Sequence, residues 1–161
     1  MIKSLLSDFS WTILFPKDKN YQGTLNSLHD QLLKKHGPDY QFFDYFRLDQ
    51  KLLDFYQSLN LDSLNIFTSG QVQNHSQVKK VLKPIFGYIF SAEVLGAGKT
   101  DPASFTLVAE KLNLKLKEIL FIDDQEKYIE AAKKAGLVTI LYRGIKDLKV
   151  KIKNLPRSLL R

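Results

Sequence analysis

The chain contains no cysteine, which excludes disulfides, thiolate metal sites and a cysteine nucleophile. It also has no apolar run near the roughly 18 residues that a membrane span needs. The short apolar start is interrupted by Asp8, too early for the core of a signal peptide. We therefore expect a cytoplasmic protein without a membrane partner. Glycine-rich nucleotide motifs are missing as well, because the loop at residues 96–99 has neither P-loop nor dinucleotide spacing.

Positive charge is the one strong imbalance, and it is concentrated at the end of the chain. The formal net charge is +7, of which Lys146–Arg161 supplies +5. A basic tail can seek nucleic acid, but such a run is more often the solvated face of a final helix. The rest of the chain is not basic enough for a nucleic-acid-binding protein. We therefore do not expect a nucleic-acid partner, and the tail is the only hint of one.

The composition is that of a globular domain, with 44% apolar and 25% charged residues over 161 positions. Short apolar runs followed by polar or glycine residues are typical of parallel strands covered on both faces. Five such runs are predicted as strands: Ile2–Ser7, Leu64–Thr68, Phe86–Phe90, Ile119–Asp123 and Val138–Tyr142. Because helical patterns alternate with them, the fold class is α/β, a doubly wound parallel five-stranded sheet.

Capping residues place three helices between these strands. Asn74 is predicted to cap a helix that runs to about Leu82. Asp101 and Pro102 suit the cap and first position of a helix ending near Leu112. A third helix is predicted over Glu126–Ala135, and Gly136 follows it where a C-terminal glycine belongs.

More than fifty residues separate the first two strands, too many for a single crossover helix. Apolar residues at helical spacing predict one helix over Thr24–His36 and a second over Phe42–Leu59. We therefore expect a small helical insertion at residues 16–60, with residues 1–15 and 61–161 forming the main domain. Most of its many aromatic side chains are expected to pack the helices of the insertion onto one another and onto the sheet domain.

The predicted strands end at residues that carry chemistry. Ligands of open parallel sheets lie beyond the carboxyl ends of the strands. Strand ends place Asp8, Thr68 and the pair Asp123–Asp124 there, and Lys99 follows the third strand in a glycine-bracketed loop. We expect these three carboxylates, the hydroxyl and the ammonium to meet in one crevice.

Each of these groups has a use in phosphoryl transfer. Clustered carboxylates repel one another unless a cation neutralises them, and oxygen ligands favour a hard ion such as Mg²⁺. Asp8 could attack phosphorus to give an aspartyl-phosphate. Thr68 could donate to a phosphoryl oxygen, and Lys99 could offset the negative charge. The three histidines show no paired spacing, so we do not expect a histidine metal site.

Four segments resemble the motifs of the haloacid dehalogenase (HAD) superfamily. SLLSDFSWTIL resembles the first, a strand ending in Asp-x-Asp-x-Thr, and NIFTSG the second, a strand ending in Thr or Ser. GKTDPASF is similar to the third. ILFIDDQEKYIEAAKKAGLVTILY resembles the fourth, an acidic pair before an alanine-rich helix. The resemblance covers nearly all of residues 2–142 and implies a Rossmann-like sheet whose helical insertion is a C1-type cap.

The resemblance also implies roles. Asp8 would be the nucleophile and a metal ligand, and Thr68, Ser69 and Lys99 would hold the phosphoryl group. Asp123 and Asp124, with the backbone carbonyl of Ser10, would hold Mg²⁺. A Mg²⁺-dependent phosphatase of a small phosphorylated compound is the function that follows.

The first motif departs from the family pattern at its catalytic acid. Ser10 stands where phosphatases of the family carry a second aspartate, which protonates the leaving group and later activates water. Losing a general acid–base costs on the order of 10²–10⁴ in rate. Trp11 replaces a small glycine, and Tyr128 stands where an aspartate or asparagine is usual. Three functions stay open: an active phosphatase, a non-catalytic relative that binds metal, phosphate or a protein, and dehalogenation or carbon–phosphorus cleavage.

Overall fold

The structure is a computed structural model that describes residues 1–159. Its centre is a five-stranded parallel sheet of order β5-β4-β1-β6-β7. The strands are β1 (Ser4–Ser7), β4 (Ser63–Thr68), β5 (Tyr88–Ser91), β6 (Ile119–Asp123) and β7 (Val138–Leu141). All five predicted strands are therefore present, with ends shifted by at most two residues, and the doubly wound fold class is confirmed.

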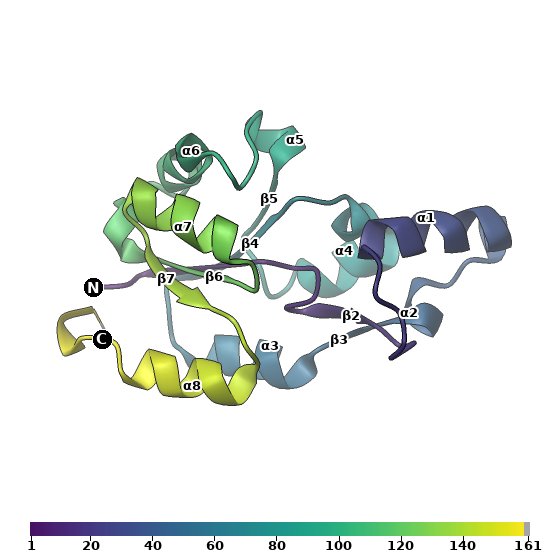
Figure 1. Cartoon of the computed structure of the whole chain (residues 1–161), viewed down its shortest axis with the longest axis horizontal. Helices are drawn as coiled ribbons and strands as arrows, with labels where there is room; N and C mark the ends of the chain where they lie inside the picture. Colours follow the sequence, from purple (N-terminus) through teal and green to yellow (C-terminus); the bar gives the residue numbers. More distant parts are fainter. Residues whose placement is uncertain (160–161) are drawn as a thin grey trace.

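Helices cover both faces of the sheet (Figure 1). The longer ones are α1 (Leu25–His36), α3 (Gln50–Ser58), α4 (Ser76–Leu82), α6 (Pro102–Leu112), α7 (Glu126–Ala135) and α8 (Ile145–Lys153). Short turns of helix are α2 (Phe42–Tyr45), α5 (Ala92–Leu95), η1 (Gly37–Asp39), η2 (Val72–Asn74), η3 (Leu116–Glu118) and η4 (Arg157–Leu159). None of the helices in residues 1–159 is long and apolar enough to cross a membrane.

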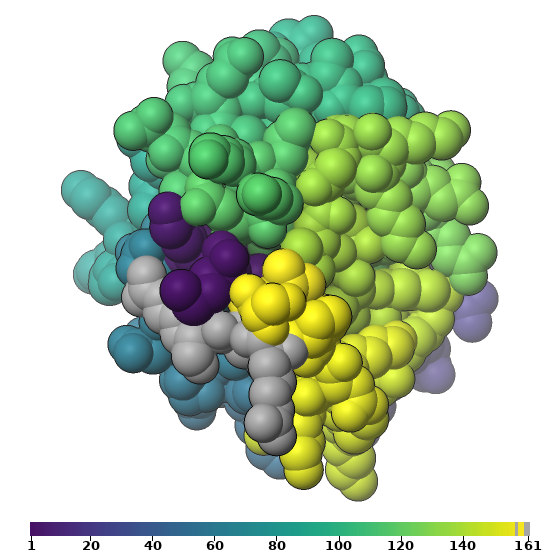
Figure 2. Space-filling model, turned by 90° about the vertical axis from the view of Figure 1, so that its left-hand side faces the viewer, coloured from purple at the N-terminus to yellow at the C-terminus, as the bar shows by residue number. Residues whose placement is uncertain are grey.

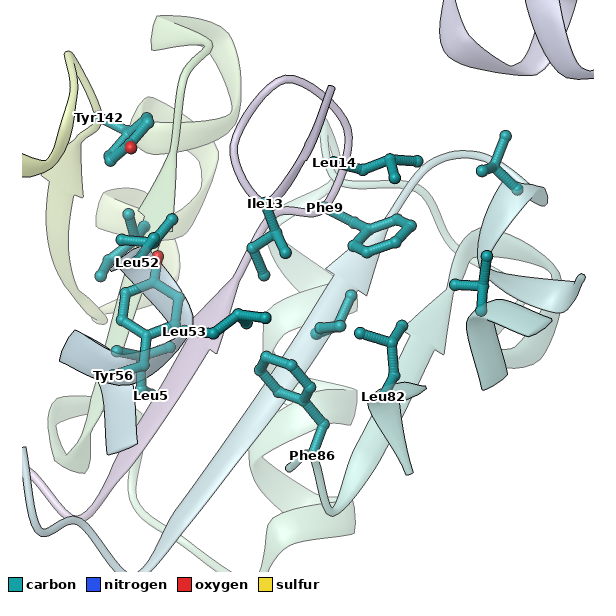
Figure 3. Close-up of a cluster of buried hydrophobic side chains, with 14 of the residues drawn as sticks. Leu5, Phe9, Ile13, Leu14, Leu52, Leu53, Tyr56, Leu82, Phe86 and Tyr142 are labelled. Carbon is teal, nitrogen blue, oxygen red and sulfur yellow. The ribbon is translucent and has the colours of Figure 1, made fainter. Parts of the chain in front are cut away.

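Alternate side chains of the central strand enter two separate cores, as the pleat of a strand requires. Leu5 lies in the core beneath α3, α4 and α8, while Leu6 lies in the core beneath α6 and α7. Figure 3 shows part of the first core, where Leu52, Leu53 and Tyr56 of α3 surround Leu5. With helices on both faces, the carboxyl ends of the strands are the part of the sheet that is open to a ligand.

The helix predictions hold in three cases, of which the helix over Thr24–His36 is α1, and need correction in two. Asp101 caps α6 by accepting from the Ala103 N–H at 2.9 Å, and Gly136 ends α7 at φ 107°. The predicted cap Asn74 is wrong, because it lies in η2 and α4 is capped by His75. His75 can do this because its Nδ1 accepts from the Gln77 N–H at 3.3 Å.

The predicted helix over Phe42–Leu59 is also wrong. It is interrupted by β3 (Phe46–Leu48), which pairs antiparallel with β2 (Leu14–Pro16). Asp49 then starts α3 afresh, since its Oδ1 accepts from the Leu52 N–H at 3.1 Å. The hairpin is the stem from which residues 17–45 extend beyond the carboxyl ends of the sheet (Figure 1).

The boundaries of the expected insertion, residues 16–60, stay a prediction. The helix α1 and the turn α2 lie within residues 17–45, beyond the hairpin. The helix α3, by contrast, packs its buried Leu52 and Leu53 into the core beneath the sheet. A boundary at the hairpin would assign α3 to the main domain.

The basic C-terminal segment packs mainly as a covering helix. Leu148 and Ile152 of α8 are buried against the sheet while Lys146 and Lys149 are exposed, which fits the solvated-helix interpretation. Beyond α8, the Ile2 N–H donates to the Leu159 carbonyl at 2.8 Å, so the two ends of the described chain lie side by side (Figure 2). The last two residues of the predicted basic tail, 160–161, lie outside the described residues.

Candidate functional site

The parallel register brings the predicted site residues together at one edge. The strand β1 lies between β4 and β6, with Ser7 opposite Ile66 on one side and Ile122 on the other. The next residue, Asp8, donates its N–H to the Ile122 carbonyl at 2.8 Å. Asp8, Thr68 and Asp123 therefore project from neighbouring strand ends.

Lys99 joins two of these carboxylates. Its Nζ lies 2.5 Å from Asp8 Oδ1 and 2.7 Å from Asp123 Oδ2. The lysine is 2% exposed, Asp8 5% and Asp123 0%, so water screens these ion pairs weakly. Burial works to lower the pKa of Lys99, but the two carboxylates outweigh burial and raise it. Lys99 is thus a fixed positive charge at the centre of the site.

The three aspartates predicted as metal ligands form one cluster. One oxygen from each of Asp8, Asp123 and Asp124 lies within 4.8 Å of the other two. Burial, and then the charge of Asp8, raises the pKa of Asp123 to about 7; burial also raises the pKa of Asp124. Asp124 Oδ1 is buried and has no hydrogen-bond partner among the described residues. A buried carboxylate oxygen without a donor is what a bound cation would satisfy.

Of the hydroxyl groups in this region, that of Thr12 contacts an aspartate and that of Thr68 lies at the end of the neighbouring strand. The Thr12 hydroxyl donates to Asp8 Oδ2 at 3.3 Å, and Thr68 is buried at the end of β4. The Thr68 Oγ1 accepts from the Gly70 N–H at 3.3 Å, which leaves the hydroxyl hydrogen available for a ligand. Ser69 is exposed and lines a neighbouring cavity of about 500 Å³ below α1. Ser10 is half-buried and forms an isolated bridge with Leu14.

The backbone at Trp11 has a conformation that suits glycine, the residue usual at this position in the motif that the segment resembles. Trp11 has φ 61°, a left-handed conformation that glycine adopts freely and a bulky residue does not. The turn is held because the Trp11 N–H donates to the Leu14 carbonyl at 2.9 Å, and the Ile13 N–H to the Phe9 carbonyl at 2.9 Å. The indole packs edge-on against Phe15 at 6.1 Å between ring centroids. The chain therefore keeps the turn after Asp8 despite an unfavourable residue.

Three features of this region escape sequence reasoning. The Tyr128 ring lies 4.5 Å from Lys99 Nζ, so an aromatic face covers the central cation. His29 of α1 and His75 meet edge to face at 5.5 Å, although 46 positions separate them, and burial lowers the pKa of both. Asn26 of α1 reaches the loop after Thr68. The first contact had a hint in the sequence, because tyrosine at position 128 stands where aspartate or asparagine is usual. The other two contacts had none, since they join distant segments.

Replacing Lys99 by methionine is expected to destabilise the fold by about 3–5 kcal/mol, because two buried carboxylates lose their common partner. Urea denaturation in a chelator at pH 8 measures this, with exposed Lys111→Met as the matched control. The loss of unfolding free energy caused by Lys99→Met should become smaller as the pH falls toward 5. The pKa of Asp123 is already raised to about 7, so its proton uptake removes one of the two charges. A cost equal to that of the control would contradict the central role of Lys99.

Comparison with known proteins gives one family. The family model of haloacid dehalogenase-like hydrolases matches residues 39–136. Enolase-phosphatase E1 of Methylococcus capsulatus is 35% identical over 86 residues, which make up 49% of this chain and 36% of that protein. The chain therefore matches only a little over a third of this relative's length.

Solved structures give the same fold at low identity. A HAD-superfamily hydrolase of subfamily IA, variant 1, from Geobacter sulfurreducens has a TM-score of 0.62 at 15% identity, covering 89% of this chain and 91% of its own. A HAD family enzyme from Bacteroides thetaiotaomicron, in complex with magnesium and inorganic phosphate, also has a TM-score of 0.62 at 15% identity, covering 92% and 99%. With the family model matching more than half of the sequence and this fold in place, the chain belongs to the haloacid dehalogenase-like hydrolase family.

Proposed function

We propose that the chain is a Mg²⁺-dependent phosphatase that acts on a small phosphorylated compound through an aspartyl-phosphate at Asp8. The observation that carries the proposal is the buried cluster in which Lys99 contacts Asp8 and Asp123 while Asp124 stands beside them. A purely structural ion pair would not need a third carboxylate, Asp124, whose buried Oδ1 has no hydrogen-bond partner among the described residues.

The donor set fits Mg²⁺. Asp8, Asp123 and Asp124 offer oxygen atoms, and Mg²⁺ binds through a few carboxylates together with water and phosphate oxygens. The Ser10 carbonyl is proposed as a further ligand. When bound, the ion would neutralise the carboxylates and the phosphoryl oxygens.

The protein's own residues would carry the first chemical step. A carboxylate oxygen of Asp8 attacks phosphorus, and the bond from phosphorus to the leaving oxygen breaks. Lys99 already contacts Asp8 and would balance the charge on the phosphoryl oxygens. Thr68 and Ser69 would donate hydroxyl groups to the same oxygens. Water then attacks the aspartyl-phosphate, which releases phosphate and restores Asp8.

Ser10 limits which substrates this site can process quickly. The leaving oxygen needs a proton unless it is stable as an anion, and a serine hydroxyl is too weak an acid to supply one at neutral pH. We therefore propose that phosphate esters with good leaving groups are hydrolysed best. The same residue also favours a second candidate function, a non-catalytic member that binds metal and phosphate without turnover.

The relatives support phosphate chemistry. Enolase-phosphatase E1 is a phosphatase by name, and the Bacteroides thetaiotaomicron enzyme was crystallised with magnesium and inorganic phosphate. Both are properties of those proteins. For this chain they favour the phosphatase over dehalogenation, which needs no Mg²⁺.

Mg²⁺ is expected to stabilise the protein and to be required for hydrolysis of an aryl phosphate such as p-nitrophenyl phosphate. At a concentration 100 times its Kd, the ion should add about 2.7 kcal/mol. This corresponds to a rise in Tm of about 5–10 °C for a domain of this size. Thermal unfolding and turnover are measured with Mg²⁺ and with a chelator. Asp124→Asn should lose most of the Tm shift, and Asp44→Asn, at an exposed position, should keep it.

The outcomes separate the candidate functions. A Mg²⁺-dependent Tm shift together with turnover supports the phosphatase. A shift without turnover points to the binding protein. Absence of both overturns the metal–phosphate assignment.

A further inference from the structure

We infer that Asn26 is a positioning residue that anchors helix α1 to the loop after Thr68. This inference rests on the proposed function, in which that loop holds the phosphoryl group. Asn26 lies in the first turn of α1, within residues 17–45 beyond the hairpin, and the loop belongs to the sheet domain. The contact therefore joins two parts of the fold that the sequence keeps 45 positions apart.

The anchor consists of two hydrogen bonds to one oxygen. Asn26 Oδ1 accepts from the Gln71 N–H at 3.0 Å and from the Val72 N–H at 3.1 Å. Val72 begins the turn η2, where backbone N–H groups have no partner within the turn. Asn26 on α1 thus supplies the hydrogen-bond acceptor for two backbone amides of the loop.

Gly70 is shaped to this contact. A Cβ at position 70 would lie 2.2 Å from Asn26 Nδ2, a distance that real atoms cannot adopt. Gly70 is not among the glycines with positive φ, so a side chain here would conflict with the position of the Asn26 amide and not with the backbone conformation. The close approach of Asn26 accounts for this glycine.

The anchored segment also orients the hydroxyl of Thr68. The Gly70 N–H donates to Thr68 Oγ1 at 3.3 Å, and the Gly70 carbonyl accepts from Gln73 Nε2 at 2.6 Å. With Oγ1 engaged as an acceptor, the Thr68 hydrogen is left to donate to a phosphoryl oxygen. Within residues 1–159, the side-chain hydrogen bonds of Asn26 go to the Gln71 and Val72 amides and reach neither Thr68 nor Asp8, so Asn26 would act through the position of Gly70.

A second contact seats the same part of the chain. Gln77 Oε1, on α4, accepts from the Phe42 N–H at 2.7 Å, and Gln77 Nε2 donates to Gln41 Oε1 at 2.6 Å. Residues 17–45 are therefore held at Gln77 as well as at Asn26, and it is Asn26 that reaches the loop after Thr68. Loss of Asn26 should loosen that loop while Gln77 keeps the rest of the segment in place.

The test compares Asn26→Ala with Asn26→Asp and uses Gln31→Ala, at an exposed position on the same helix, as the control. In Asn26→Ala, amide hydrogen exchange at Gln71 and Val72 should accelerate about 10-fold, since each amide loses its acceptor. A carboxylate is also an acceptor, so Asn26→Asp should keep the protection. Inorganic phosphate should bind about 10-fold more weakly to Asn26→Ala, and kcat/KM for p-nitrophenyl phosphate should fall similarly. Mg²⁺ affinity should stay within about two-fold, because the aspartates are untouched.

Unchanged exchange in Asn26→Ala overturns the anchor. Faster exchange with unchanged phosphate affinity and kcat/KM overturns the positioning role. A fall in Mg²⁺ affinity as large as that in phosphate affinity overturns it too, since it indicates general loosening. If the wild-type chain neither binds phosphate nor hydrolyses the ester, both the proposed function and the positioning role of Asn26 are wrong. The exchange data then still show whether the anchor exists.

Discussion

Ser10→Asp is expected to raise the turnover of an alkyl phosphate by about 10²–10⁴-fold, the usual contribution of a placed general acid–base. An alkoxide leaves phosphorus poorly without a proton, so an alkyl ester reports the missing acid far better than an aryl ester. Ser10 follows the proposed nucleophile, Asp8, by two residues and is half-buried, so an aspartate at this position would be partly accessible to a substrate. Steady-state kinetics on both ester classes measure the effect.

The matched control for this gain is Ser10→Asn, which has nearly the shape of aspartate but no proton to transfer. Trp11, the next residue, is the obstacle that we expect because of its bulk. The double variant Ser10→Asp with Trp11→Gly removes it, and glycine suits the φ of 61° at that position. Equal gains in the aspartate and asparagine variants would refute acid catalysis. No gain even in the double variant would favour the binding protein.

Asp8→Asn is expected to abolish phosphatase activity, with a loss on the order of 10⁴-fold or more. Losses of this size are typical when an enzyme loses its nucleophile. An amide is nearly isosteric with a carboxylate but does not attack phosphorus. The variant should still fold, because Lys99 keeps its contact with Asp123. Turnover of p-nitrophenyl phosphate measures the loss, and circular dichroism checks the fold.

The control for Asp8→Asn is Asp44→Asn, which makes the same chemical change at an exposed site. Acid quenching of the wild-type reaction with labelled substrate should trap a phosphoenzyme that is absent from Asp8→Asn. Activity that survives the substitution, or a phosphoenzyme that still forms, would rule out Asp8 as the nucleophile.

The sheet and its carboxyl edge could be predicted because both depend on local pattern. Each strand is an apolar run, and a parallel sheet brings the residues after such runs to one edge. This is why Asp8, Thr68 and Asp123 were found by position alone. Lys99 lies in a loop, so strand pattern did not predict its position. It was assigned to the site because its positive charge would balance the carboxylates. Their roles in phosphoryl transfer stay predictions.

What could not be predicted depends on partners far away in the sequence. The segment at Phe46 has helical spacing, yet it becomes a strand because Leu14–Pro16 offers it backbone partners. A tertiary pairing of this kind overrides local propensity. Likewise, nothing near Asn26 indicates that the amides of Gln71 and Val72 need an acceptor. Contacts between residues 17–45 and the sheet domain have no periodic pattern to reveal them.

The lysine between two aspartates has a consequence for the order of assembly. With Lys99 in contact with Asp8 and Asp123, the interior of the metal-free chain already contains a counter-ion. Folding then need not wait for a divalent cation, in contrast to small metalloproteins that stay unfolded until they bind their ion. Under the proposed function, the cation would then bind after folding is complete and could exchange with solvent. Metal supply would then set how much of the protein is active, while the metal-free chain would already be folded.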